Sequence, residues 1–116
     1  MAMADVNVET VGEIVVASVD GEIDMSNATE IGETVSRAVF NEALGLVIDL
    51  REVDYLDSAA IQVIFELHER LEVRGQRLRL VIAPDSPIAE TLRVADVPAA
   101  IGADETPEAA LQSMAG

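Results

Sequence analysis

The residue pair best suited to chemistry in this sequence is Asp57-Ser58, which lies between an apolar strand and an apolar helix. The strand is expected at residues 46–50 and the helix at residues 59–74. Ser58 is therefore expected at a helix N-terminus, where unpaired backbone N–H groups and the helix dipole favour negative charge. Its hydroxyl has two uses there: it can cap the helix, or it can accept a phosphate that the helix end tolerates.

Three other side chains are candidates for chemistry, and each also has a structural explanation. Asp57 can be a second cap near the helix dipole, or it can orient the Ser58 hydroxyl for a kinase. Asp24 precedes the first expected helix, where an exposed turn carboxylate is the ordinary explanation. His68, the single histidine, lies seven residues after Ile61 on the apolar side of its helix. That position favours packing over catalysis or metal binding.

Composition and charge narrow the classes of function. The 116 residues, 50% hydrophobic and 25% charged, are expected to form one globular domain over residues 1–116 with its core at about 6–111. Seven arginines, no lysine and 22 acidic residues give a net charge of −15. This charge argues against nucleic acid and anionic membranes as partners, and it favours basic or mixed protein partners.

Several kinds of site and segment have no sequence signal. Without cysteine there is no disulfide, thiolate chemistry or cysteine-based metal site. No glycine-rich phosphate loop is recognisable either, and we expect neither a cofactor nor a metal. The first residues lack a basic export signal, and no apolar run approaches the roughly 20 residues of a membrane span. We therefore expect no membrane insertion and a cytoplasmic location.

The first half of the chain is expected to form a hairpin and a helix. Residues 6–9 and 14–19 are rich in β-branched side chains, which predicts an antiparallel pair that ends at Asp20-Gly21. Asn27 and Glu30 have capping-box spacing and predict a helix from that point to about Asn41. Its buried face is expected to contain Ile31, Val35, Ala38 and Val39.

The second half is expected to alternate strands and helices. Residues 46–50 lack polar alternation, which predicts a central strand covered on both faces, followed by a polar loop at 51–54. Gly75 should end the helix after Ser58, and residues 78–83 should form a parallel strand. A short helix capped by 85–87, an edge strand at 99–101 and a helix from Thr106 complete an α/β fold. It comprises a mixed sheet of four or five strands, an N-terminal antiparallel hairpin and about four packed helices.

The order and spacing of four segments resemble the STAS domain of bacterial anti-sigma factor antagonists. The segments are Gly21-Glu22-Ile23-Asp24, Val47-Ile48-Asp49-Leu50, Tyr55-Leu56-Asp57-Ser58 and Gly75-Gln76, and the resemblance covers Val6 to Leu111. In that family, a kinase that is also the anti-sigma factor phosphorylates the serine of an Asp-Ser-(Ser/Thr)-Gly motif. Asp57 and Ser58 match this motif, whereas Ala59 and Ala60 replace its last two residues.

The resemblance implies a protein-binding switch in transcription regulation rather than an enzyme. The unphosphorylated form would bind a cytoplasmic anti-sigma factor with serine kinase activity through Asp24, Asp57, Ser58, Ala59 and Ala60. Phosphorylation of Ser58 would release the complex, and a serine phosphatase would restore binding.

Two alternatives remain open from the sequence. The first is a STAS-type structural subunit of a lipid-transport complex or stress-signalling scaffold, in which Ser58 is never modified. The Ala59-Ala60 pair, in place of the usual residues, keeps that alternative open. The second is an acid/base hydrolase that uses carboxylates with His68 as a helper. A hydrolase would require a pocket in which those groups converge.

Overall fold

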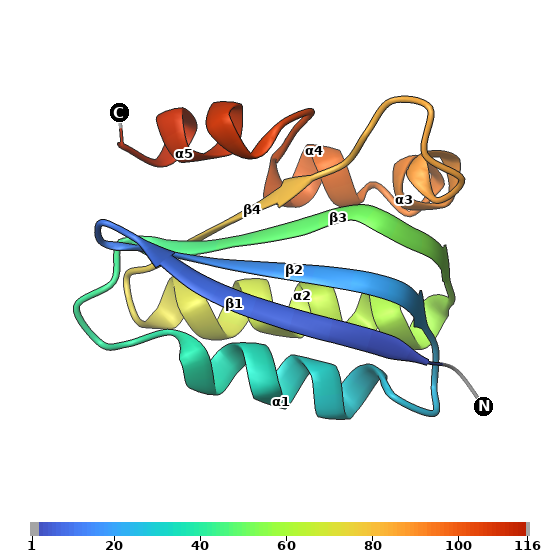
Figure 1. The fold of residues 1–116 in the computed structure, drawn as a ribbon, viewed down its shortest axis with the longest axis horizontal. Coiled ribbons are helices and arrows are strands. Elements are labelled where there is room, and N and C mark those ends of the chain that lie inside the picture. The colour runs from blue at the N-terminus through green and yellow to red at the C-terminus, as the bar shows by residue number, and fades with distance from the viewer. Residues whose placement is uncertain (1–2, 116) are drawn as a thin grey trace.

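The computed structural model describes residues 3–115, which form one mixed β-sheet with helices on both of its faces (Figure 1). Residues 1, 2 and 116 of the expected domain range lie outside the described residues. The elements, in chain order, are β1 (Ala4–Val11), β2 (Ile14–Ile23), α1 (Ala28–Ala38), β3 (Gly45–Leu56), α2 (Ser58–Val73), β4 (Arg77–Val81), α3 (Ala89–Val94), α4 (Val97–Ile101), β5 (Ala103–Asp104) and α5 (Pro107–Ala115).

The sheet has the strand order β1-β2-β3-β4-β5, which is also the order along the chain. β1 and β2 form an antiparallel hairpin, whereas β2, β3, β4 and β5 are parallel neighbours. Each parallel connection needs a crossover, and α1 and α2 provide the crossovers from β2 to β3 and from β3 to β4. The expected α/β class, mixed sheet and N-terminal hairpin are confirmed; residues 3–115 contain five helices rather than about four.

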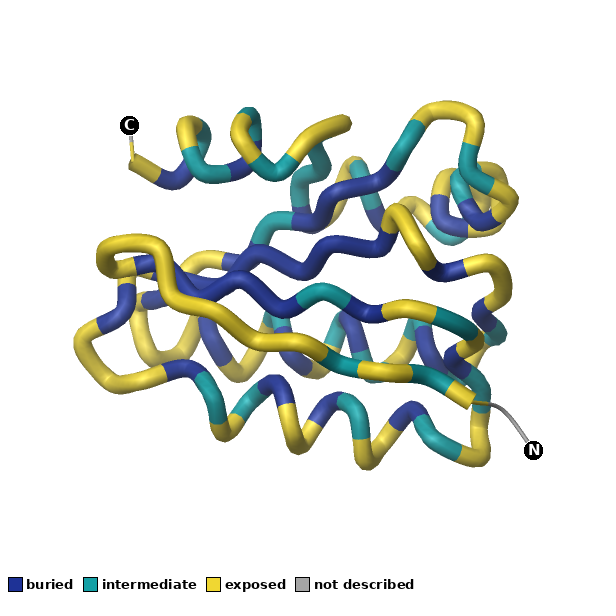
Figure 2. The backbone as a smooth tube through the Cα atoms, viewed as in Figure 1, coloured by how far each residue is buried: buried dark blue, intermediate teal, exposed yellow. Residues whose placement is uncertain are grey.

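The first half of the central strand β3, residues 45–50, is buried on both faces, as its largely apolar sequence predicts, whereas residues 51, 52, 54 and 55 are exposed (Figure 2). Ile48 contributes to a larger apolar cluster beneath α1 and α2, together with Ile64, Leu71 and Leu80. Val47 points to the opposite face, where it belongs to a smaller cluster with residues of α5. Two separate clusters on the two faces explain why this strand has no polar alternation.

β2 and β3 are longer than their sequences suggest. Residues 51–54 continue β3 instead of forming a polar loop, and Asp20-Gly21 lies within β2 instead of ending it. The two strands stay paired up to Ile23 and Leu56 through two register irregularities. Gly21 has φ +118°, and a Cβ built there would lie 2.3 Å from the Met3 carbonyl oxygen. The glycine thus permits close approach within the strand rather than a turn.

Two elements near the C-terminus also differ from the expectation. Residues 99–101, expected as an edge strand, belong to helix α4, and the edge strand is β5 at Ala103–Asp104. Helix α4 begins after Asp96, which has a left-handed backbone conformation, and Pro98 lies in its first turn. These two helix-start signals are stronger than the strand signal of the short apolar run at 99–101. Helix α3 begins at Ala89, so residues 85–87 precede it rather than open it.

The boundaries of the remaining helices agree better with their sequence signals. Gly75 ends α2 with φ +75°, while the Gln76 N–H donates to the Leu71 carbonyl at 2.8 Å. The Thr106 hydroxyl accepts a hydrogen bond from the Ala109 N–H at 3.1 Å and caps α5. Helix α1 ends at Ala38, three residues before the expected Asn41.

Candidate functional site

The candidate site lies at the edge of the sheet where β2 and β3 end and α1 and α2 begin (Figure 1). Ile23 and Leu56, the last residues of the two strands, are register partners. The Asp57 N–H also donates to the Ile23 carbonyl at 3.3 Å. The 24–27 loop and the first turn of α2 are therefore held beside each other by the pairing of their parent strands.

Asp57 connects these two segments through its carboxylate. Oδ1 accepts a hydrogen bond from the Ala60 N–H at 3.1 Å, which makes Asp57 the N-cap of α2. Oδ2 accepts a hydrogen bond from the Met25 N–H at 3.1 Å, 32 residues away in the chain. One carboxylate thus caps a helix and also fixes the neighbouring loop.

Ser58 is the first residue of α2 and is exposed to solvent. The sequence correctly places it at the helix N-terminus, but the capping role that we considered for it belongs to Asp57. The hydroxyl of Ser58 is therefore not the group that stabilises the start of this helix. A serine at this position can be modified without removal of a cap.

The 24–27 loop is fixed by hydrogen bonds within it. The Asp24 carboxylate accepts hydrogen bonds from the Ser26 hydroxyl at 2.6 Å and from the Ser26 N–H at 2.8 Å. These bonds lower the pKa of Asp24 below its usual value, and the bond from the hydroxyl has the larger effect. This carboxylate is therefore charged at neutral pH. Any stability that they add is present above the ordinary carboxyl pKa and is lost as the pH falls through the lowered one.

Asn27 occupies the N-cap position of α1 but bonds backward into this loop. Its Oδ1 accepts from the Asp24 N–H, and its Nδ2 donates to the Glu22 carbonyl, each at 2.9 Å. The capping box expected between Asn27 and Glu30 is therefore wrong, because the side chain makes no bond to the helix. The asparagine instead adds two bonds that hold the loop in one conformation.

The structure brings together most of the residues proposed from the sequence. Asp24, Asp57 and Ala59 are half-buried at this edge beside the exposed Ser58. Ala60 differs, since its side chain is only 1% exposed and packs in the larger apolar cluster. Its N–H donates to Asp57, so Ala60 positions the site from beneath the surface.

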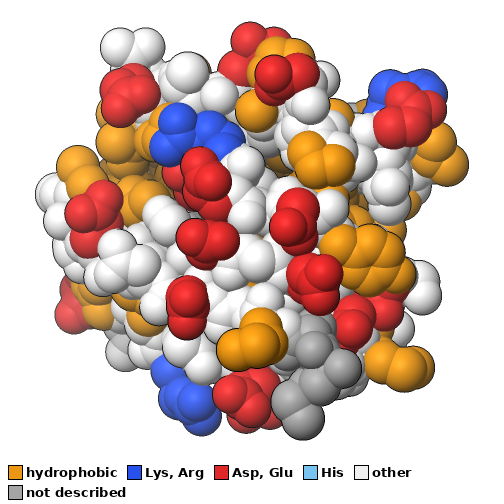
Figure 3. Space-filling model, turned by 45° about the vertical axis from the view of Figure 1, so that its right-hand side comes forward, with side chains coloured by type: hydrophobic (Ala, Val, Ile, Leu, Met, Phe, Trp, Pro, Cys, Tyr) orange, Lys and Arg blue, Asp and Glu red, His pale blue; other side chains and the backbone are white. Residues whose placement is uncertain are grey.

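Met25 and Tyr55, which are exposed apolar residues at this edge, were not singled out by sequence reasoning. Met25 is 82% exposed, and Tyr55, the β3 register partner of Glu22, is 51% exposed. An apolar residue inside an otherwise polar turn is the only sequence signal that could have identified Met25. Figure 3 shows this side of the molecule, where hydrophobic side chains lie among many acidic and few basic ones.

Asp57→Ala is expected to lower the free energy of unfolding by about 1–2 kcal/mol, because it removes a helix cap. Amide exchange at Met25 should also become faster, since that N–H loses its acceptor. Asp54→Ala, at an exposed neighbour on β3, is the matched control and should change stability by about 0.5 kcal/mol or less. Urea denaturation and amide exchange measured by NMR test this, and an unchanged Met25 exchange rate would contradict the bridging role.

His68 lies away from this edge, on the middle of α2. Its side chain is 25% exposed, and Nε2 lies 3.8 Å from a carboxylate oxygen of Glu72. Within residues 3–115, no group of three or more histidine, aspartate or glutamate side chains is arranged to hold a metal ion. The described geometry therefore offers His68 one carboxylate neighbour and no set of metal ligands.

His68→Gln is expected to change stability only modestly and to leave partner binding intact, because the side chain lies away from the candidate site and has one carboxylate neighbour. Titration of the wild-type protein with zinc should show no stoichiometric uptake. Calorimetry with zinc and with the partner checks both statements. Tight one-to-one zinc binding that disappears in His68→Gln would overturn this interpretation.

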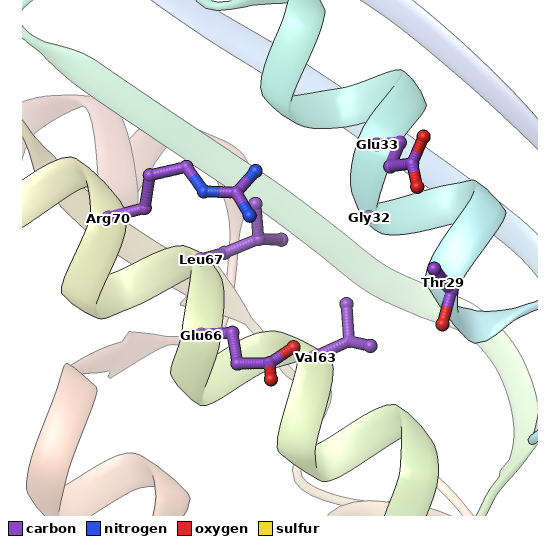
Figure 4. Close-up of a pocket in the computed structure, with 7 residues that line it drawn as sticks. All are labelled: Thr29, Gly32, Glu33, Val63, Glu66, Leu67 and Arg70. Atoms are coloured by element: carbon purple, nitrogen blue, oxygen red, sulfur yellow. The ribbon is translucent and has the colours of Figure 1, made fainter.

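A pocket between α1 and α2 does contain two carboxylates, from Glu33 and Glu66 (Figure 4). Its volume is about 90 Å³, well below the roughly 300 Å³ at which ligand sites begin. His68 is not among the residues that line it. The hydrolase alternative needs His68 and several carboxylates to converge, but this pocket lacks His68, and the pocket of about 350 Å³ that His68 does line contains one carboxylate, that of Glu72.

No helix within residues 3–115 combines the length and the apolar character needed to cross a bilayer. The comparisons with known proteins address the fold more directly. A family model described as the STAS domain matches residues 5–110. No curated protein sequence gives a match.

Three solved structures share the architecture. An anti-sigma factor antagonist from Mycobacterium paratuberculosis is 23% identical, with a TM-score of 0.87 over 98% of this chain and 96% of that one. The anti-sigma factor antagonist SpoIIAA in its unphosphorylated form is 23% identical, with a TM-score of 0.74 over 97% and 99%. The Bacillus cell fate determinant SpoIIAA in its phosphorylated form is 20% identical, with a TM-score of 0.66 over 94% and 98%. At these identities the likeness establishes a shared fold.

Proposed function

This chain belongs to the STAS domain family, and from that premise we propose that it acts as an anti-sigma factor antagonist. In its unphosphorylated form it binds a cytoplasmic anti-sigma factor that is also a serine kinase, and it thereby frees a sigma factor for transcription. It works as a binding protein rather than an enzyme. ATP belongs to the kinase, and this chain supplies the acceptor hydroxyl of Ser58.

The observation that carries this proposal is the exposed Ser58 at the start of a helix that Asp57 already caps. A kinase must reach the hydroxyl oxygen, form its bond to the γ-phosphorus of ATP and release ADP. Exposure gives access, and the absence of a capping duty means that modification leaves α2 intact. The N-terminal helix dipole also favours the negative charge of the product.

The departure from the family motif at Ala60 is compatible with this function. The motif has glycine at this position, and a larger side chain on the surface could obstruct a partner. The Ala60 methyl group is buried in the core beneath the site, so it adds no bulk to the docking surface. Ala59, half-buried beside Ser58, is the substitution that a kinase would encounter directly.

The partner-binding surface in this proposal comprises the 24–27 loop and the first turn of α2. Asp24, Ser58 and Ala59 lie at this surface, while Asp57 and Ala60 hold its two segments in place. Phosphorylation places about −1.5 to −2 charges at its centre. The complex then dissociates, and a serine phosphatase returns the protein to its binding form.

Phosphorylation can be tested with the purified protein, candidate anti-sigma factor kinases and ATP. We expect one added phosphate by intact mass, mapped to Ser58 by fragmentation, and none on Ser58→Ala. Stable binding to such a kinase without any phosphate transfer would favour the structural-subunit alternative instead. Absence of both binding and transfer, with a kinase that is active on another substrate, would argue against an antagonist role.

A further inference from the structure

Met25 is an exposed apolar side chain on an ordered backbone. Its side chain is 82% exposed, yet its N–H is bound to Asp57 and the residues on both sides of it are tied into the loop. The backbone around Met25 is therefore already ordered in the free protein, so binding a partner costs little further backbone conformational entropy. Preorganised anchors of this kind raise affinity because binding has less conformational freedom to remove.

A methionine side chain suits an apolar pocket because it is flexible, unbranched and polarisable. Tyr55, half-exposed near the end of β3, adds a second apolar contact at the same edge. Interface energy concentrates in a few such anchors, and aromatic residues and methionine are enriched at interfaces. Met25 and Tyr55, which we call the apolar pair, are thus two exposed apolar residues available for contact at this edge.

The surroundings of the apolar pair define the chemistry of the partner. Glu22, Asp24 and Asp54 flank it in the chain. No arginine lies within residues 3–36, and the nearest one to Tyr55 in sequence, Arg51, is paired with the Asp49 carboxylate at 2.8 Å. A partner that covers this edge must therefore offer an apolar socket whose rim carries arginine or lysine.

We propose that Met25 is the apolar anchor that selects the cognate anti-sigma factor, by insertion into a socket bordered by basic residues. This inference rests on the proposed function and specifies the contact that provides its affinity and selectivity. The basic rim meets the carboxylates beside Met25, while Ser58 faces the nucleotide of the kinase. Affinity is therefore sensitive to salt at the rim and to side-chain shape at Met25.

The test is calorimetric titration of the cognate anti-sigma factor with wild type, Met25→Ala, Met25→Leu and Val73→Ala. Val73 is the matched control, because it is 89% exposed at the opposite end of α2. Met25→Ala should weaken binding about tenfold or more. Met25→Leu should stay close to wild type, and Val73→Ala should stay within about twofold. Wild-type affinity should also fall as salt is raised from about 50 to 300 mM.

The outcomes separate this inference from the function on which it rests. If wild type binds and Ser58→Asp, added to the same titrations, binds poorly, but Met25→Ala binds like wild type, the anchor is wrong and the switch stands. If Met25→Ala and Val73→Ala weaken binding equally, selection by Met25 is also overturned. If wild type binds no anti-sigma factor, both proposals fail. Thermal unfolding of each variant confirms that it is folded, which is expected because both positions are exposed.

Discussion

The protein phosphorylated at Ser58 is expected to bind its anti-sigma factor a few hundred-fold more weakly than the unmodified protein. In the free protein the phosphate is well tolerated, since the start of α2 offers N–H groups and a dipole contribution of roughly 0.3–1 kcal/mol. In the proposed complex it would have to be desolvated beside the Asp57 carboxylate and opposite the nucleotide phosphates of the kinase. A penalty of about 3–4 kcal/mol corresponds to the expected loss of affinity.

Variants of Ser58 separate the charge from the hydroxyl. Ser58→Ala should bind like the unmodified protein and should not respond to ATP. Because Asp57 provides the cap, this variant should change stability by about 0.5 kcal/mol or less. Ser58→Asp should bind poorly, although one charge on a short side chain reproduces phosphate incompletely. Calorimetric titration of all four forms is the measurement, and equal affinities for folded proteins would refute the switch and favour a structural subunit.

Ile48→Ala and Ile64→Ala are each expected to lower the free energy of unfolding by about 2–5 kcal/mol. Ile48 lies on the central strand and pairs in register with Ala17 and Leu80, while Ile64 covers it from α2. Both side chains are 5% exposed or less, so truncation loses transfer free energy and also leaves a cavity. Chemical denaturation gives the comparison.

The control for this experiment is Val73→Ala, which removes a similar aliphatic group from a residue that is 89% exposed. It should change the denaturation midpoint little. The double variant of Ile48 and Ile64 should deviate from the sum of the single effects, because the two residues belong to one cluster. Midpoints unchanged by both core truncations would contradict the packing of α2 on the sheet.

The sequence by itself determined the layers of the fold and the general place of the site. The apolar run at 46–50 required a strand covered on both faces, and Gly75 provided the stop for α2. Asp57-Ser58 marked the start of that helix correctly, to within one residue. These features depend on burial periodicity and on the chemistry of helix ends, which act over only a few neighbouring residues.

Tertiary structure alone decided how the residues of the site share their roles. Asp57 could cap α2 and also bind Met25 only because the pairing of β2 with β3 aligns Ile23 with Leu56. The same long-range pairing extends β3 over residues 51–54, whose polar sequence alone predicts a loop. The length of a strand depends on the strand beside it as well as on its own residues. Packing of α2 against the sheet then turned Ala60 inward and left Ser58 exposed, an outcome that local sequence cannot determine.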